Sequence, residues 1–309
     1  MRIAITGGAG VVGTRLVREL AATPREIELR ILDLPSAANL ESMARLGHEV
    51  VPTDICCRED LDRALEGCEV VVHLAAALRA PGREAMFRAI NDQGTANVVE
   101  AAKVCGCRRL VQVSSISVHY LRQNSYSRSK RLAESRVLNS GLPQVHIARP
   151  TLACGVGGGV EFQSFVDRIR HWPILPLVSG GRALKAPVHV DDLCVALRQL
   201  CLEPLPLRGE WDLPGGEVLS LATMARRIAQ VLGLRRPLVS VPYPLAKAMV
   251  SLLERTRPLA AKADSITWQT LTGMVENAVG DPRLAQAHLR WAPRGFGEFL
   301  PHLGLEKRS

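Results

Sequence analysis

The sequence predicts an α/β protein with a Rossmann-type, doubly wound parallel sheet and a smaller C-terminal substrate-binding lobe. Short runs rich in valine and isoleucine alternate with helical patterns through the first half of the chain, which is typical of buried parallel strands joined by helices. A glycine-rich loop follows the first run. From about residue 151 glycine and proline become dense, and helical patterns dominate after 220.

Six bounded apolar runs are the predicted strands, and they cover residues 2–6, 28–33, 48–54, 69–75, 109–115 and 144–150. Between them apolar residues recur every three or four positions, as on one face of a helix, most clearly in 11–22 and 94–106. Repeated β-α-β units of this kind build a doubly wound sheet. The predicted division is a cofactor-binding domain at 1–155, to which 188–203 returns, and a lobe at 156–187 and 204–309.

Composition restricts the class of protein. A chain of 309 residues with 47% hydrophobic content can fill a sizeable core, and its apolar runs are shorter than the ~20 residues that a bilayer span needs. The start of the chain has no signal-peptide pattern, so we expect a cytoplasmic protein without a transmembrane segment. The net charge is +9, but the arginines are dispersed and aromatic residues make up only 4%. We therefore expect no nucleic-acid partner.

The spacing of cysteines and histidines predicts neither disulfides nor a metal site. The eight cysteines form no CxxC pair, and thiols in cytosolic proteins stay reduced, so we expect mostly buried thiols. Four histidines lie on predicted strands or their ends without the spacing of metal ligands, and we interpret them as structural: His73, His119, His146 and His189.

The glycine-rich loop is the first candidate binding site. Gly7, Gly10 and Gly13 have a GxxGxxG spacing between the first predicted strand and the first predicted helix. Such glycines allow a tight turn and let backbone N–H groups approach a pyrophosphate at the positive end of a helix. The alternative interpretation is a glycine-rich β-α turn without a ligand.

Asp33 supports the nucleotide interpretation and indicates which cofactor binds. It ends the second predicted strand about 20 residues after Gly13, where a carboxylate contacts the adenosine ribose hydroxyls. Leu34 and Pro35 follow it instead of an arginine, so a 2′-phosphate would meet a negative charge without a counter-ion. We therefore expect NAD rather than NADP. Asp54 has two interpretations, a contact with the adenine amine and a strand-end cap.

Tyr126 and Lys130 are candidate catalytic residues, because positions i and i+4 share one face of a helix. The pair follows the fifth predicted strand, and ligands bind beyond the carboxyl ends of parallel strands, which also brings Ser115 to the nicotinamide. A tyrosine of pKa near 10 is a poor base at neutral pH, whereas the Lys130 ammonium and a cationic nicotinamide favour the phenolate. Tyr126 would exchange a proton with a substrate hydroxyl while Ser115 holds the reacting oxygen and Lys130 binds the cofactor ribose.

Taken together, the motifs resemble those of the extended short-chain dehydrogenase/reductase family, the NAD-dependent epimerase/dehydratase group. The resemblance rests on "TGGAGVVG", "VVHLAA" at 71–76, "NDQGTANVVEAA" at 91–102, "VSSISV", "YSRSK", "ARPTLACG" at 148–155 and "PVHVDDLCVAL" at 187–197. These motifs occur in the family's order over nearly the whole chain. The resemblance implies a catalytic set of Ser115, Tyr126 and Lys130.

The resemblance also implies the rest of the cofactor site and an assembly. It places Ala75 and Ala76 beside the cofactor and gives Asn91 the role of steadying the sheet. Further cofactor contacts are implied at Val11, Val12, Ile55, Leu74, Val113 and Pro150. A homodimer through paired helices is implied as well, with 82–105 and 126–140 as the candidate segments.

Two departures from the family leave the substrate open. Tyr126 follows Ser115 by 11 positions, whereas typical members carry a longer substrate-binding loop there. Members that act on nucleotide sugars usually have an Arg-Asp pair for the diphosphate where this chain reads "LKAPVHVDD". Lys185 could replace that arginine only as a point charge without a bidentate fork, Arg182 is another candidate, and solvated loop cations are the alternative interpretation. Ser117 is a further candidate for substrate contact.

The C-terminal third is similar to the lobe of sugar epimerases and of a bacterial subgroup related to a respiratory-complex accessory subunit. Within it, residues 244–256 have an amphipathic pattern with two basic residues, Lys247 and Arg255. A helix packed on the lobe and a helix that contacts a membrane surface both fit this pattern.

Three hypotheses of function result. The first is an NAD-dependent epimerase or dehydratase that acts at a secondary alcohol of a nucleotide sugar. The second is an NAD-dependent dehydrogenase or reductase of a hydroxysteroid-like or uronate-like substrate, which the missing Arg-Asp pair favours. The third is a non-catalytic NAD(P)-binding accessory protein, against which the intact Ser-Tyr-Lys set argues, because binding alone requires no phenolate.

Overall fold

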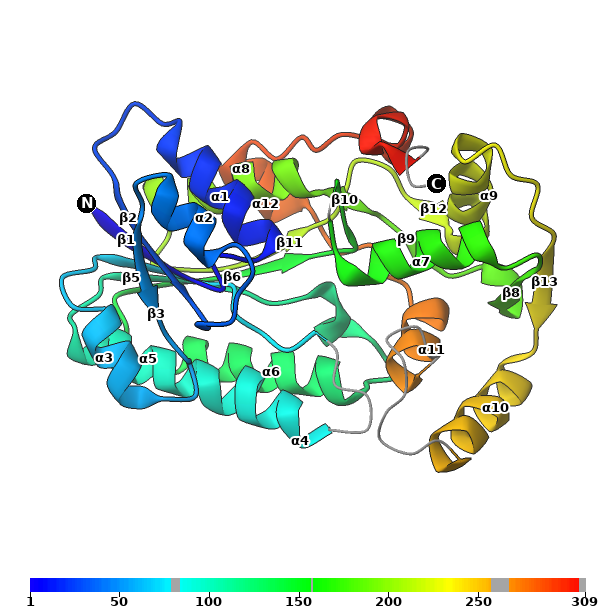
Figure 1. The fold of residues 1–309 in the computed structure, drawn as a ribbon, viewed down its shortest axis with the longest axis horizontal. Helices are drawn as coiled ribbons and strands as arrows, with labels where there is room; N and C mark the ends of the chain where they lie inside the picture. Colours follow the sequence, from blue (N-terminus) through cyan, green and yellow to red (C-terminus); the bar gives the residue numbers. More distant parts are fainter. Residues whose placement is uncertain (79–83, 157, 257–266, 306–309) are drawn as a thin grey trace.

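A seven-stranded parallel sheet forms the centre of the computed structural model (Figure 1), which describes residues 1–78, 84–156, 158–256 and 267–305. Its strands are β1 (Arg2–Thr6), β2 (Glu28–Asp33), β3 (Glu49–Pro52), β4 (Val70–His73), β5 (Arg109–Val113), β6 (Gln144–Pro150) and β11 (Arg208–Leu213). They lie in the order β11-β6-β5-β4-β1-β2-β3, with every neighbouring pair parallel. The order reverses between β1 and β4, the point at which doubly wound folds bind dinucleotides. The predicted fold class is confirmed.

Helices cover both faces of this sheet (Figure 1). One face carries α1 (Val11–Ala21), α2 (Leu40–Arg45), α8 (Val190–Leu202) and α12 (Arg283–Leu289), and the other carries α3 (Arg58–Ala64), α5 (Thr95–Val104) and α6 (Ser125–Leu138). Side chains of a strand alternate between the two faces, so Ile3 and Ile5 enter one core while Ala4 enters the other. Because both faces are buried, the strands are nearly continuous apolar runs, and this is why the sequence reveals them.

The lobe has a core of its own, in which Phe162, Ile228 and Phe296 are fully buried. Its helices are α7 (Val160–His171), α9 (Leu221–Val231), α10 (Tyr243–Thr256), α11 (Trp268–Val275) and α13 (Phe296–Phe299). Short strand pairs complete it: β7 (Ala153–Cys154) with β10 (Val188–His189), β8 (Leu175–Val178) with β13 (Leu238–Val241), and β9 (Leu184–Lys185) with β12 (Leu219–Ser220). The lobe lies beyond the end of the sheet at which the predicted site residues are found (Figure 1).

The structure differs from the predicted elements in three places. Strand β11 belongs to the main sheet, whereas the sequence predicts that 204–309 belongs to the lobe. Only Trp211 and Leu213 of this strand are buried, so the strand has no apolar run by which the sequence could reveal it. From 188–203 it is the helix α8 that packs on the main sheet, while β10 pairs outside it. A π-helix, Phe87–Gly94, precedes α5 and follows the short helix α4 (Glu84–Met86). The division into two domains itself stays a prediction.

Three further expectations concern the thiols, the membrane and metal binding. All eight cysteines carry free thiols, and five of them are buried: Cys68, Cys107, Cys154, Cys194 and Cys201. Within the described ranges, none of the helices combines the length and the apolar content that crossing a bilayer requires. The same ranges hold no group of three or more histidine, cysteine or carboxylate side chains placed to bind a metal ion.

A buried ion pair fixes α6 to the sheet. The Arg149 guanidinium, on β6, donates through Nε to Glu134 Oε1 at 2.8 Å and through Nη2 to Glu134 Oε2 at 2.7 Å. It also contacts the Glu210 carboxylate on β11. The side chains of Arg149 and Glu134 are 10% and 7% exposed. The bidentate geometry compensates for the cost of removing two charges from water, and it orients the helix that carries Tyr126 and Lys130.

We expect Arg149→Leu to lower the free energy of unfolding by about 3–5 kcal/mol, because it leaves the Glu134 carboxylate buried without its cation. Urea denaturation followed by circular dichroism measures this loss. The matched control is Arg45→Leu, whose partner Glu41 is 85% exposed and whose loss should cost less than about 0.5 kcal/mol. Equal losses in the two variants would contradict the assigned role of the buried pair.

Candidate active site

The loop between β1 and α1 is shaped by close backbone approaches. Gly7 has a φ of +69°, and a Cβ atom there would lie 2.7 Å from the backbone nitrogen of Ala75. A Cβ atom at Gly13 would lie 2.5 Å from the carbonyl oxygen of Gly8. Gly10 is the N-cap of α1, and its N–H donates to the Gly7 carbonyl at 3.1 Å. The first N–H groups of α1 therefore lie just beyond β1, a cradle that fits the pyrophosphate of a dinucleotide.

The Asp33 carboxylate is attached to this glycine loop. Its Oδ2 accepts a hydrogen bond from the Ala9 N–H at 2.9 Å, and its Oδ1 accepts one from the Leu34 N–H at 2.9 Å. Asn39, which the sequence did not indicate, donates from Nδ2 to the Ala9 carbonyl at 3.0 Å. These bonds fix the carboxylate beside the start of α1, which is where an adenosine ribose is held in folds of this kind.

The other residues assigned to the cofactor also lie at the carboxyl ends of the strands. The Asp54 Oδ1 atom accepts a hydrogen bond from the Cys56 N–H at 2.9 Å, so its strand-end cap is formed, and its adenine contact stays a prediction. Val11 and Val12 begin α1, Ile55 follows β3, Leu74, Ala75 and Ala76 follow β4, and Val113 and Pro150 end β5 and β6.

Ser115, Tyr126 and Lys130 lie at the carboxyl end of β5, as the sequence predicts. The Lys130 ammonium is buried and donates to the Val113 carbonyl oxygen at 2.7 Å. Burial lowers the pKa of Lys130 to about 8, opposed by the nearby Glu134 carboxylate. Burial also raises the pKa of Tyr126, the charge of Glu161 raises it further, and a hydrogen bond with the Ser115 side chain lowers it. These three groups can therefore exchange a proton with an oxygen atom placed between Ser115 and Tyr126.

Asn91 connects this set to the strand-end loop after β4. The side chain is 1% exposed; its Oδ1 accepts from the Ala77 N–H at 2.7 Å, and its Nδ2 donates to the Ala77 carbonyl at 3.1 Å. The same Nδ2 donates to Ser129 Oγ at 2.9 Å, and Ser129 Oγ donates to the Tyr126 carbonyl at 2.7 Å. Asn91 lies in the π-helix, a local distortion that frequently accompanies functional sites. Its contacts are to protein groups and place the helix of Tyr126.

His73, which the sequence indicates as structural, lies in a buried hydrogen-bonded chain beneath the site. Its Nδ1 is 2.6 Å from Thr6 Oγ1 and its Nε2 is 3.0 Å from Thr95 Oγ1. Thr95 Oγ1 in turn donates to the Asn91 carbonyl at 2.7 Å. Burial, aided by the positive charge of Lys130, lowers the pKa of His73 to about 3. The imidazole is therefore neutral and connects β1, β4 and the π-helix.

Lys185 is buried in the lobe, and its contact with substrate stays a prediction. Its Nζ atom donates to the carbonyl oxygens of Gly273 and Glu276 at 2.7 and 2.6 Å. These carbonyls lie at the C-terminal end of α11, where a cation offsets the negative end of the helix dipole. Burial lowers the pKa of Lys185 to about 8, while Glu161 and Glu276 oppose that shift. Arg182 is exposed, and its contact with substrate stays a prediction.

Glu161, in the first turn of α7, is a charged group that the sequence did not indicate and that raises the pKa of Tyr126. Its Oε1 accepts from Gln269 Nε2 at 3.1 Å, and the same amide donates to the Leu78 carbonyl at 2.8 Å. Gln269 thus joins α11, α7 and the segment after β4. After burial, the Glu161 charge is the next cause that raises the pKa of Tyr126 and of Tyr120. An acidic residue in a first helical turn is common, so no sequence signal sets Glu161 apart.

The short segment between Ser115 and Tyr126 is held by the lobe. The Glu276 carboxylate, at the end of α11, accepts from the backbone N–H groups of Leu121 and Arg122 at 3.1 and 3.3 Å. It also accepts from the Arg122 guanidinium at 2.9 Å. Ser117 is buried, and its hydroxyl finds no hydrogen-bond partner among the described residues. An orphaned hydroxyl of this kind is compatible with the predicted substrate contact of Ser117.

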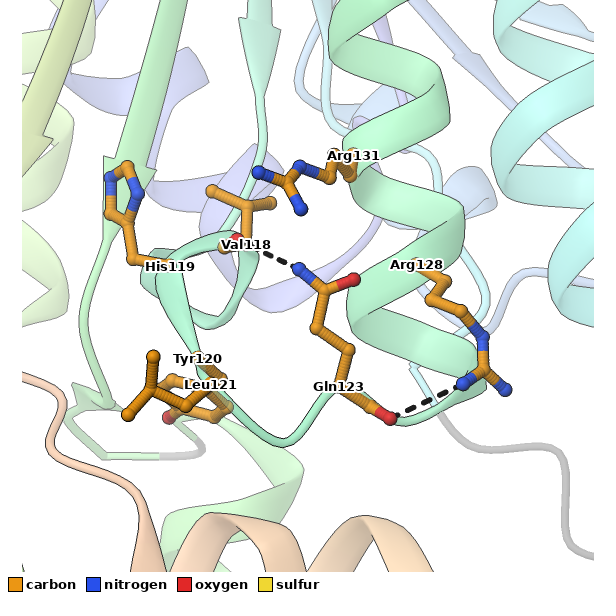
Figure 2. A pocket seen from close by; sticks show the side chains of 7 residues that line it. All are labelled: Val118, His119, Tyr120, Leu121, Gln123, Arg128 and Arg131. Atoms are coloured by element: carbon orange, nitrogen blue, oxygen red, sulfur yellow. Dashed lines mark hydrogen bonds between the residues drawn. The ribbon is translucent and has the colours of Figure 1, made fainter.

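A cavity of about 610 Å³ adjoins the same segment (Figure 2). His119, Leu121 and Gln123 line it from the segment, and Arg128 and Arg131 line it from α6. Gln123 Nε2 donates to the Val118 carbonyl at 3.1 Å, and Arg128 Nη1 donates to the Gln123 carbonyl at 3.2 Å. Neither Tyr126 nor Lys130 lines this cavity. Ser115 is likewise absent from the lining residues.

Comparisons with known proteins identify relatives of this chain. Residues 4–123 match the model of the 3-beta hydroxysteroid dehydrogenase/isomerase family. Ceramide reductase of Caulobacter vibrioides is 31% identical over 245 residues, which cover 78% of this chain and 74% of that protein. UDP-glucose 4-epimerase of Vibrio cholerae is 27% identical over 267 residues, which cover 79% of each protein. The solved structure of MoeE5 in complex with UDP-glucuronic acid and NAD has a TM-score of 0.74 at 19% identity, covering 99% of this chain and 98% of that chain.

The buried His73 predicts how stability depends on pH. Its pKa is near 3 in the folded protein and about 6.5 in the unfolded chain, so the unfolded state binds the extra proton as the pH falls through this window. The contribution of neutral His73 to the free energy of unfolding is therefore complete above pH 6.5 and is lost as the pH falls toward 3. We expect His73→Gln to lose less free energy of unfolding between pH 7 and pH 5 than the unsubstituted protein, by about 2 kcal/mol. Urea denaturation at the two pH values measures this, and identical pH dependence would contradict it.

Proposed function

The chain belongs to the extended short-chain dehydrogenase/reductase family, and we propose that it reduces a ketone group of an uncharged, lipid-like substrate to a secondary alcohol. NADH is the proposed reductant. One observation carries the proposal: the Glu161 carboxylate, an exposed group of α7 that Gln269 holds at 3.1 Å, raises the pKa of Tyr126 by its charge. The negative charge of Glu161 favours the reductive direction and disfavours an anionic substrate.

The direction follows from the protonation state of Tyr126. A general base needs a phenolate, whereas a general acid needs a phenol that keeps its proton until the reaction occurs. Burial and the Glu161 charge both raise the pKa of Tyr126, so the phenol stays protonated at neutral pH. A protonated phenol next to the Ser115 hydroxyl supports proton donation to a carbonyl oxygen, which is the reductive direction.

The residues of the site then have distinct tasks. NADH, when bound, supplies the hydride that the carbonyl carbon receives. Tyr126 donates its proton to the carbonyl oxygen, and the Ser115 hydroxyl donates a hydrogen bond to the same oxygen. The products would be the alcohol, NAD⁺ and a Tyr126 phenolate, and the phenolate would take up a proton from the solvent. The Lys130 ammonium, held by the Val113 carbonyl at 2.7 Å, stabilises that phenolate by its charge.

The class of substrate follows from the charges on the lobe side. A diphosphate needs cations, yet the Lys185 ammonium is committed to two backbone carbonyls and Glu161 contributes a negative charge there. Glu161 is exposed, and bringing a diphosphate next to its carboxylate is unfavourable because like charges repel even where solvent screens them. An uncharged substrate avoids this repulsion. The 31% identity to a ceramide reductase also supports a lipid-like ketone.

A nucleotide-sugar epimerase or dehydratase is the second candidate. The relative from Vibrio cholerae, a UDP-glucose 4-epimerase that matches over 79% of each chain, favours it. The same three residues would serve, with Tyr126 first removing a proton from a sugar hydroxyl and later returning it. Arg182, which is exposed, would then be the residue for the diphosphate. An enzyme of this kind retains its nucleotide through a closed cycle, so release of stoichiometric NAD on denaturation would favour it over the reductase.

The test of the proposed reaction is a set of substitutions in the catalytic residues. We expect Tyr126→Phe to lower the rate of NADH-dependent ketone reduction by about 10²–10⁴-fold, because it removes the proton donor and keeps the ring. A series of steroid ketones and long-chain ketones serves as substrate, followed by NADH absorbance. Tyr120→Phe is the control, since it removes a neighbouring phenol that lies outside the catalytic set. Undiminished reduction by Tyr126→Phe would refute the catalytic assignment.

Glu161→Gln tests the role of the carboxylate, because it keeps the shape and the contact with Gln269 while removing the charge. Without that charge the Tyr126 phenolate is easier to form, so the pH profile of alcohol oxidation should shift to lower pH by roughly one unit. Affinity for UDP-glucose, measured by calorimetry, should rise by roughly tenfold. Asp167→Asn, on the same helix with a half-exposed side chain, is the matched control. An unchanged pH profile and unchanged affinity for UDP-glucose would argue against the proposed role of Glu161.

A further inference from the structure

Phe87 is a large buried side chain that lies outside the three hydrophobic cores. It begins the π-helix and is 5% exposed. Among the described residues, neither the two cores of the main sheet nor the core of the lobe includes it. Its ring contacts that of Tyr126, with the centroids 5.9 Å apart and an interplanar angle of 68°. This is the edge-to-face geometry that aromatic pairs prefer, so the side chain belongs to the surroundings of Tyr126.

The π-helix holds Tyr126 at two points. Asn91, about one turn after Phe87, donates to Ser129 Oγ at 2.9 Å, and Ser129 Oγ donates to the Tyr126 carbonyl at 2.7 Å. These bonds fix the backbone of Tyr126. They do not set the two side-chain torsions, χ1 and χ2, that aim the ring. The contact with Phe87 acts on the ring itself, which the hydrogen bonds do not reach.

The direction of the Tyr126 ring matters because its hydroxyl is the proposed proton donor. The hydroxyl is at the far end of the ring from the backbone, so a small rotation of the side chain displaces it strongly. A misplacement of about 1 Å can cost a reaction about 10²-fold in rate. The phenol shares a hydrogen bond with the Ser115 side chain. Phe87 can hold the ring without a polar group that competes for this hydrogen bond.

We propose that Phe87 is a positioning residue, whose ring holds that of Tyr126 at the angle at which the phenol meets Ser115 and the substrate oxygen. In this role Phe87 acts through Tyr126 and not on the substrate. The role rests on the proposed catalytic function of Tyr126. The alternative is that Phe87 only fills space, in which case another apolar side chain of comparable size would serve as well.

The kinetics of Phe87→Leu distinguish these two roles, because leucine keeps the apolar character and removes the flat ring. We expect kcat for the NADH-dependent reduction of a long-chain ketone to fall by about three- to tenfold, which is the value of an edge-to-face pair. KM for the ketone should stay within about twofold, since Phe87 does not act on the substrate. Phe87→Tyr keeps the ring and should retain most of the unsubstituted kcat.

Phe296→Leu is the matched control. Phe296 is fully buried in the core of the lobe and forms an edge-to-face pair with Phe299, with the centroids 5.5 Å apart and an interplanar angle of 90°. The same substitution there removes an equivalent pair from another core, so it should lower the melting temperature and leave kcat unchanged. Thermal unfolding of every variant establishes that each is folded. A kcat that falls equally in Phe87→Leu and Phe296→Leu, or that does not fall in Phe87→Leu, would overturn the positioning role.

The motion of the Tyr126 ring gives a readout that does not depend on activity. The chain has three tyrosines, so labelling the tyrosine ε carbons with carbon-13 gives few NMR signals, and the signals that Tyr126→Phe loses are those of Tyr126. Relaxation dispersion measures the rate of ring flips, and we expect Phe87→Leu to raise that rate by about tenfold or more. An unchanged rate would overturn the positioning role. Undiminished ketone reduction by Tyr126→Phe would instead refute the proposed reaction, and with it the catalytic purpose of the contact.

Discussion

The buried ammonium of Lys130 is the constraint on which the arrangement of the site depends. A charge removed from water needs compensation at short range, and the Val113 carbonyl provides it at 2.7 Å. That contact joins the middle of α6 to the last residue of β5, so the helix has little freedom to rotate or slide along the sheet. One turn earlier on the same face, Tyr126 is brought to the end of the strand beside Ser115. The geometry of the proposed catalytic set thus depends on satisfying one cation.

Other buried polar groups support the same helix from different sides. Asn91 holds Ser129, the residue before Lys130, and the Arg149–Glu134 pair holds the next turn against β6. His73 connects the underside of the glycine loop to the π-helix that carries Asn91. Each bond is inside the protein, where a hydrogen bond is strong and an unsatisfied group is costly. The end of β1, the π-helix and α6 are therefore connected by hydrogen bonds through His73, Thr95, Asn91 and Ser129.

The lobe uses its buried charges for a different purpose. Lys185 and Glu276 are both occupied in joining α11 to its neighbours, the first through helix-end carbonyls and the second through the backbone of the catalytic segment. This leaves Glu161 as the charge that the lobe turns toward Tyr126. The Lys130 ammonium on the side of the sheet and the Glu161 carboxylate on the side of the lobe give the two sides of the site opposite charge. That polarity is the basis on which we propose a proton donor and an uncharged substrate.

The sequence by itself determined the fold class, the predicted strands and the positions of the glycine loop, Asp33 and the Ser-Tyr-Lys set, because these depend on local patterns and on short spacings. Buried parallel strands are apolar throughout, and a helical i, i+4 pair always shares a face. Only the tertiary structure decided that β11 joins the sheet, that Lys185 is committed to carbonyls, and that Glu161 lies near Tyr126. Those facts depend on contacts between residues far apart in the chain, where a lone charge or a half-apolar strand has no local pattern to distinguish its partner.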